Sequence, residues 1–185
     1  FGSKSNRDIK SVTPIIQQID AHFDTYQSLS DDALRAKTTE FKTRIQQYLS
    51  AIDEQITQLN AQAEQENLGL EEKEVIFGQV DKLKKERVEA IEEVLNEILP
   101  EAFAVVKEAS RRFSTNEFIR VQATPLDREL AVSNPHIKIE GDIAVYPNKW
   151  TAAGGEISWN MVHYDVQLIG GIVLHRGKIA EMATG

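Results

Sequence analysis

The chain has 185 residues, of which 41% are hydrophobic, and it carries a formal net charge of -8 at pH 7. This length and apolar content suit one globular domain, or a domain with an appendage, and they exclude a disordered chain. The acidic balance argues against a nucleic-acid surface. The lack of cysteine excludes disulfides and thiolate metal sites. No apolar run reaches the roughly 18–20 residues that span a bilayer.

The first region, residues 1–30, contains one predicted helix. Apolar residues follow Pro14 at helical spacing, and proline suits the first position of a helix. These residues are Ile15, Ile16, Ile19, Phe23 and Tyr26. We therefore expect a helix that begins near Pro14 and docks its apolar stripe on another element.

Residues 31–98 are predicted to form a long antiparallel helical hairpin. The first helix starts near residue 30, where the hydroxyl of Ser28 or Ser30 can cap it, and is expected to reach Glu66. Apolar residues repeat every three or four positions on both sides of a break at residues 67–70, which is typical of two helices that pack on each other. The first series is Leu34, Phe41, Ile45, Leu49, Ile52, Ile56, Leu59 and Ala63, and the second is Ile76, Val80, Leu83, Ala90, Ile91, Val94 and Ile98.

The chain is then predicted to restart as a separate helix over residues 99–113, with Pro100 at its first position. Its apolar residues, among them Phe103 and Val106, recur at helical spacing. They suit a packed core, so we assign them no catalytic role.

Residues 114–160 have the texture of a small antiparallel β unit. Alternating residues and a turn at Gly141 predict one hairpin, and the glycines of residues 152–155 predict a second turn. Trp150 and Trp159 flank this second turn. They could form an exposed binding patch, but we favour the interpretation that they bury apolar area in a small sheet.

The last region, residues 161–185, contains the candidate site. The Gln167 carboxamide has an acceptor and an adjacent donor, which complement the N6 donor and N7 acceptor of adenine, and Tyr164 could supply a stacking ring. Thr184 and Gly185 look like the opening of a phosphate-binding loop, although the Gly-Lys-Thr that completes such a loop is not among these residues. A surface amide on an amphipathic segment is the alternative interpretation of Gln167. The four histidines show no metal-ligand spacing.

Four segments of the chain resemble, in the same order, segments of the SecA family of preprotein translocase ATPases. They are residues 1–8, 29–45, 99–112 and 164–185. The chain is thus expected to be an N-terminal piece that ends where the Walker A loop begins. Residues 46–94 and 114–160 lack a counterpart in the common family pattern, so we interpret both as insertions.

The resemblance implies a fold, a site and a cofactor. The whole protein would be an α/β, P-loop, RecA-like motor that binds ATP with Mg²⁺, whereas this part is mostly α-helical with a long antiparallel hairpin and a small antiparallel β insertion. The adenine contacts would come from Met161, Tyr164 and Gln167, and Thr184 with Gly185 would open the phosphate loop. Tyr164 stands where the family usually has Phe, and stacking should survive that change.

The resemblance also implies partners and a location. They are an unfolded preprotein, a membrane channel complex, an acidic phospholipid surface and a second copy of the protein, on the cytoplasmic face of the cell membrane. The whole protein would hydrolyse ATP, whereas the present residues contain no catalytic group and are expected to be inactive alone. The alternative is a helical scaffold or interaction module that binds no nucleotide.

Overall fold

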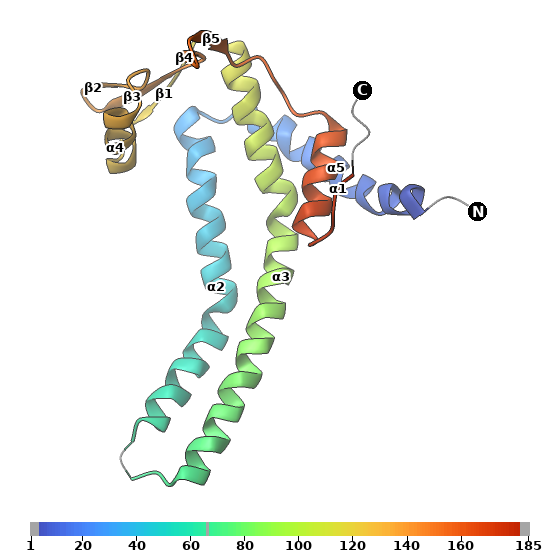
Figure 1. Ribbon diagram of the computed structural model, residues 1–185, viewed down its shortest axis with the longest axis vertical. Coiled ribbons are helices and arrows are strands. Elements are labelled where there is room, and N and C mark those ends of the chain that lie inside the picture. Colours follow the sequence, from blue (N-terminus) through green and yellow to red (C-terminus); the bar gives the residue numbers. More distant parts are fainter. Residues whose placement is uncertain (1–3, 66, 182–185) are drawn as a thin grey trace. The chain divides into compact units, whose positions relative to one another are not determined.

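The structure is a computed structural model that describes residues 4–65 and 67–181 (Figure 1). Its elements, in chain order, are α1 (Lys4–Tyr26), α2 (Asp31–Ala63), α3 (Leu70–Thr115), β1 (Phe118–Gln122), α4 (Pro125–Ser133), β2 (Lys138–Glu140), β3 (Ile143–Pro147), β4 (Lys149–Ala152), β5 (Gly155–Ser158) and α5 (Asp165–His175). The chain divides into two compact units. One comprises residues 1–37 and 100–185, and the other, residues 38–99, is the helical hairpin.

In the hairpin unit, α2 and α3 lie side by side and antiparallel, as the sequence predicts (Figure 1). Leu49 and Ala63 of α2 and Ile76, Val80 and Val94 of α3 are buried along the seam. The first helix ends at Ala63, not at the predicted Glu66. The residues that follow Ala63 are polar, so a further helical turn would gain no apolar contact.

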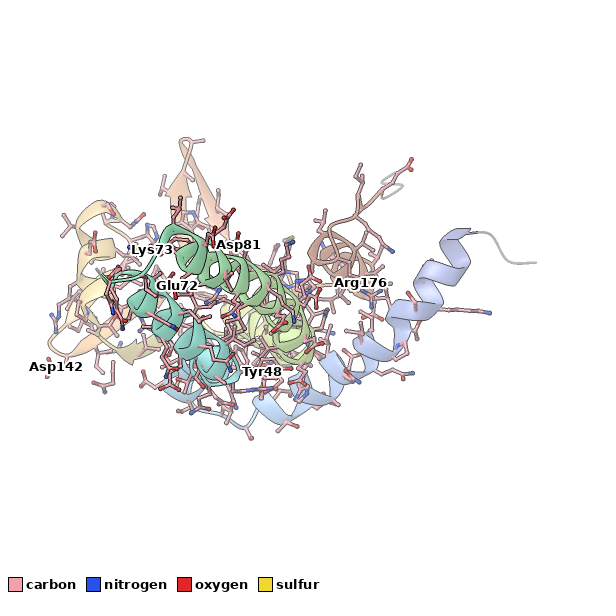
Figure 2. All side chains as sticks on the ribbon, turned by 90° about the horizontal axis from the view of Figure 1, so that it is seen from below. Tyr48, Glu72, Lys73, Asp81, Asp142 and Arg176 are labelled. Carbon is pink, nitrogen blue, oxygen red and sulfur yellow. The ribbon has the colours of Figure 1, made fainter. Side chains whose placement is uncertain are left out.

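Polar bonds join the two hairpin helices outside the seam. The Arg87 guanidinium bonds both carboxylate oxygens of Asp53, and the Tyr48 hydroxyl donates to Glu93 at 2.9 Å. Figure 2 labels Tyr48 on this surface. Residues 38–99 contain fourteen acidic and seven basic residues, so the hairpin carries -7 of the chain's net charge of -8.

In the other unit, α1, α5 and residues 100–115 of α3 form a helical core. Val12, Ile16 and Ile19 of α1 and Leu168 and Ile172 of α5 are buried. The predicted start of the first helix at Pro14 is wrong, because α1 already begins at Lys4 and contains Pro14. The apolar stripe extends upstream to the buried Val12, so helical packing begins before the proline.

The predicted break before Pro100 is also wrong, because α3 is one helix of 46 residues with Pro100 inside it. An interior proline costs about 3 kcal/mol, since it removes one helical hydrogen bond and crowds the preceding turn. Ile98, Leu99 and Ala104 are all buried. Their burial offsets that cost, because a buried Ile or Leu side chain contributes about 1.5–3 kcal/mol when it leaves water.

The predicted β region contains two small antiparallel sheets. The first has the strand order β1-β3-β2 and the second pairs β4 with β5. Both predicted turns are confirmed. Gly141 has φ 62° between β2 and β3, where Figure 2 labels the neighbouring Asp142, and Ala153 and Gly154 have φ 51° and 81° between β4 and β5. Two consecutive positive φ angles match the right-handed twist of a two-residue hairpin.

The β region also contains a helix that we did not predict. Thr124 caps α4 and Pro125 occupies its first turn. The Thr124 backbone N–H donates to Asp127 at 2.7 Å, which completes a capping box. The sequence Thr-Pro-Leu-Asp carried this signal, but the surrounding strand pattern obscured it.

Among the described residues, no helix is both long and apolar enough to cross a membrane.

Candidate functional site

The candidate site lies at the beginning of α5. Tyr164 is extended, with φ -78° and ψ 157°, and the helix begins at Asp165. An acid in the first turn favours this start, because the N-terminus of a helix carries a partial positive charge. The helix ends before Gly177, whose φ of 68° suits glycine. Residues 178–181, which follow this turn, form no regular secondary structure.

α5 is seated on the helical core through a close contact at Gly171. A Cβ atom at this position would lie 2.7 and 2.9 Å from two ring carbons of Phe103 in α3. Leu168 and Ile172, one turn apart, are buried on the same face. The opposite side of the first turn therefore faces outward, and Gln167 is exposed there.

The far end of α5 is tied to α1. Arg176, labelled in Figure 2, follows the last residue of α5, and its Nη1 atom donates to the Ser11 hydroxyl at 3.4 Å. Because both ends of α5 are held, its N-terminal residues keep a defined position on the unit.

The structure brings Tyr164 and Gln167 together. The Tyr164 backbone N–H donates to Gln167 Oε1 at 2.9 Å, and the Gln167 N–H donates back to the Tyr164 carbonyl at 2.9 Å. The Tyr164 ring is 75% exposed. A carbonyl oxygen has two lone pairs, so Oε1 keeps one acceptor position and Nε2 keeps its two N–H donors.

Met161 lies three residues before Tyr164, and Trp159 holds its backbone carbonyl. The Trp159 indole N–H donates to the Met161 carbonyl at 2.9 Å, and the Met161 side chain is 57% exposed. In the segment of chain between Met161 and α5, the Nδ1 atom of His163 is buried and has no hydrogen-bond partner in the described part of the chain. Thr184 and Gly185, the remaining predicted site residues, lie outside the described residues.

Two polar clusters hold other elements of this unit together, and sequence reasoning missed both. In the first, Glu108 is fully buried and bonds Arg111 at 2.7 and 2.8 Å and Arg112 at 2.7 Å. Arg112 also donates to Asp31 and to the carbonyls of Tyr26 and Leu29. Burial alone would raise the pKa of Glu108, but the two guanidinium groups outweigh it and lower that pKa.

The second cluster surrounds Asp127 of α4, which is also fully buried. Arg35 Nη2 donates to both carboxylate oxygens at 2.7 and 2.8 Å, and Thr124 and the Tyr146 hydroxyl donate as well. Burial would raise the pKa of Asp127, but these hydrogen bonds hold it well below its ordinary value. Burial and then the bond to Asp127 raise the pKa of Tyr146 to about 12.

These clusters are structural. Every acid in them is paired with arginine. Among the described residues, no group of three or more His, Asp or Glu could hold a metal ion. Trp150 and Trp159, both half-buried, line an apolar cavity of about 420 Å³ together with Phe113.

The fold and the site together define a helical platform with an exposed amide and an exposed aromatic ring at one helix N-terminus. This arrangement can bind and orient a planar ligand with hydrogen-bonding edges.

The whole chain, residues 1–185, matches the family model described as the SecA DEAD-like domain. The chain belongs to the SecA family. It is 52% identical over 185 residues to the protein translocase subunit SecA of Porphyromonas gingivalis strain W83, and 50% identical over 185 residues to that of Bacteroides fragilis. Each match covers 100% of this chain and 16% of the relative. No solved structure gives a significant match.

The chain therefore spans about one sixth of the length of these relatives. Because the matches run through the whole chain, these relatives also contain the hairpin and the β region. The interpretation of residues 46–94 and 114–160 as insertions relative to other members of the family stays a prediction.

Proposed function

We propose that this chain is the N-terminal part of an ATP-driven preprotein translocase motor, in which it supplies the adenine contacts of the nucleotide site. Family membership supports the motor, since the matched relatives are named protein translocase subunits. The observation that carries the adenine assignment is the exposed pair at the start of α5, where the Gln167 amide is hydrogen-bonded to the Tyr164 backbone.

The chemistry of this pair fits adenine. Gln167 Oε1 has a free lone pair for the N6 amino group, and Nε2 has a donor for N7. The exposed Tyr164 ring offers a face on which a base can stack, and the Met161 side chain adds an exposed apolar contact. Thr184 and Gly185 belong to the proposed site as the start of the phosphate loop.

The motor would use ATP with Mg²⁺ to drive an unfolded preprotein through a membrane channel complex. In this proposal the present residues orient the base, whereas the groups that act on the phosphates belong to the longer protein. A P-loop positions those phosphates through backbone N–H groups and a lysine, so these residues alone are not expected to hydrolyse ATP.

The proposal includes the partners implied by the resemblance. They are an acidic phospholipid surface, the channel complex and a second copy of the protein, at the cytoplasmic face of the cell membrane. The basic residues Lys4, Arg7 and Lys10 at the start of the chain support an encounter with anionic lipid. The acidic hairpin does not favour that encounter, so we assign the lipid contact to the beginning of α1.

Equilibrium binding of ADP to the full-length protein tests the adenine assignment. Gln167→Ala should weaken binding by roughly 5- to 150-fold, because a bidentate contact to a base contributes about 1–3 kcal/mol. Gln55→Ala, at an exposed amide on α2, is the matched control and should leave the affinity unchanged. Equal affinities for the wild type and Gln167→Ala would remove the adenine assignment and favour the helical scaffold.

A further inference from the structure

The Gln167 amide forms a hydrogen bond within its own helix. Its oxygen accepts the backbone N–H of Tyr164, the residue just before the first turn of α5. This bond satisfies a donor that the helix itself leaves without a partner. Because a carboxamide has one oxygen and one nitrogen, fixing the oxygen also fixes the direction of the NH₂ group.

We infer that the backbone N–H of Tyr164 is a specificity determinant of the site, because it locks the Gln167 amide in the orientation that accepts a 6-amino purine and rejects a 6-oxo purine. The inference rests on the proposed adenine function. It assigns a positioning role to a main-chain atom, in addition to the contacts of the Gln167 and Tyr164 side chains.

The discrimination follows from the hydrogen-bonding groups on the base. Adenine presents a donor at N6 and an acceptor at N7, which match the oxygen and nitrogen of the locked amide. A 6-oxo purine such as hypoxanthine presents two acceptors, so its O6 would face the fixed Gln167 oxygen. An amide released from the helix could instead turn both N–H donors of its NH₂ group to these two acceptors.

The geometry of the lock allows it to persist when the base is bound. The Gln167 oxygen has a second lone pair, so it can accept from Tyr164 and from the N6 amino group together. Gln167 is exposed on the outer side of the first turn, whereas Leu168 beside it is buried and fixes the helix. The base therefore meets an amide whose orientation is set before binding, which lowers the entropic cost of recognition.

The test compares the affinities of the full-length protein for ADP and inosine diphosphate, which differ at position 6 of the base. Two variants separate the backbone donor from the ring. Tyr164→Ala removes the ring and keeps the N–H, whereas Tyr164→Pro removes both, and the φ of -78° at this position suits proline. We expect the preference for ADP to be about fivefold smaller in Tyr164→Pro than in Tyr164→Ala, which corresponds to about 1 kcal/mol.

A second measurement guards against a misfolded proline variant. Replacing Tyr164 by its α-hydroxy acid analogue keeps the ring and exchanges only the N–H for an ester oxygen, and it should reduce the ADP preference by a similar factor. Without nucleotide, hydrogen exchange at the Tyr164 amide should be faster in Gln167→Ala than in Gln167→Glu, which retains a carboxylate acceptor.

The outcomes distinguish this inference from the proposed function. If wild-type protein binds neither nucleotide, the adenine assignment itself fails. If the wild type prefers ADP but the ester analogue keeps the full preference, the adenine assignment stands and the locking role of the Tyr164 N–H is overturned.

Discussion

Two glycines inside helices should respond in opposite directions to the same substitution. At Gly171 in α5, an alanine Cβ would lie 2.7 and 2.9 Å from ring carbons of Phe103, whereas at Gly78 in α3 nothing lies within 4 Å. Alanine gains about 0.5–1 kcal/mol over glycine in a helix interior. Overpacking costs about 1–3 kcal/mol, and a contact this short with a ring belongs in the upper part of that range.

Gly171→Ala should therefore destabilise α5 by about 1–2 kcal/mol, and Gly78→Ala should stabilise the hairpin by about 0.5–1 kcal/mol. Native-state hydrogen exchange of each helix measures both effects, because local opening is resolved amide by amide. In α5 the expected change is roughly 5- to 30-fold faster exchange.

The second substitution Phe103→Leu, made together with Gly171→Ala, should recover part of the lost protection by removing the ring that the new methyl group meets. If Gly171→Ala instead slows hydrogen exchange in α5, as Gly78→Ala should in α3, then α5 does not pack against Phe103 and the packing derived for the site is wrong.

Three further predictions concern the polar clusters. Burial and the bond to Asp127 raise the pKa of Tyr146 from 10.0 to about 12, so the stabilising effect of its neutral phenol is complete below pH 10 and is lost as the pH rises through 12. The decline in urea-unfolding stability over that range should be smaller in Tyr146→Phe than in the wild type, and an equal decline would contradict the role of this phenol. Thr124→Ala should lower the free energy of unfolding by about 1 kcal/mol in the same assay, because it removes the cap of α4. Thr124→Ser keeps the hydroxyl and should retain most of that stability. Equal losses of stability in the two variants would exclude a capping role. Arg112→Leu leaves the buried Glu108 with a single guanidinium and should lower the free energy of unfolding by about 3 kcal/mol or more. A loss of stability under 1 kcal/mol would contradict the burial described for Glu108.

The sequence correctly predicted those elements whose conformation depends on residues that are close together in the chain. The apolar series around residues 67–70 predicted the hairpin, and the glycines at Gly141 and Gly154 predicted both turns. At the start of α5, Tyr164 and Gln167 are joined by a hydrogen bond from the backbone N–H to the amide oxygen, and their contact with adenine stays a prediction. In each case the residues that decide the structure lie within a few positions of one another, so their spacing carries the information.

The features that sequence reasoning missed depend on distant partners. Pro100 ends a helix by its own preference, and only the burial of its neighbours keeps α3 continuous. The sequence gives no sign that Asp127 is buried, because its partner Arg35 lies 92 positions away. The bond from Tyr164 to Gln167 is local, and a glutamine three residues into a helix is a known capping signal. It was overlooked because the same side chain had already been interpreted as a ligand contact.

The uneven distribution of charge gives the hairpin a physical role apart from any binding. Since residues 38–99 carry -7 and the rest of the chain only -1, most of the net negative charge at pH 7 comes from carboxylates remote in sequence from α5. Protonating them in mild acid would remove the mutual repulsion between molecules and bring on precipitation. Mutations that tune solubility can therefore accumulate in the hairpin without altering the charges on the remaining residues.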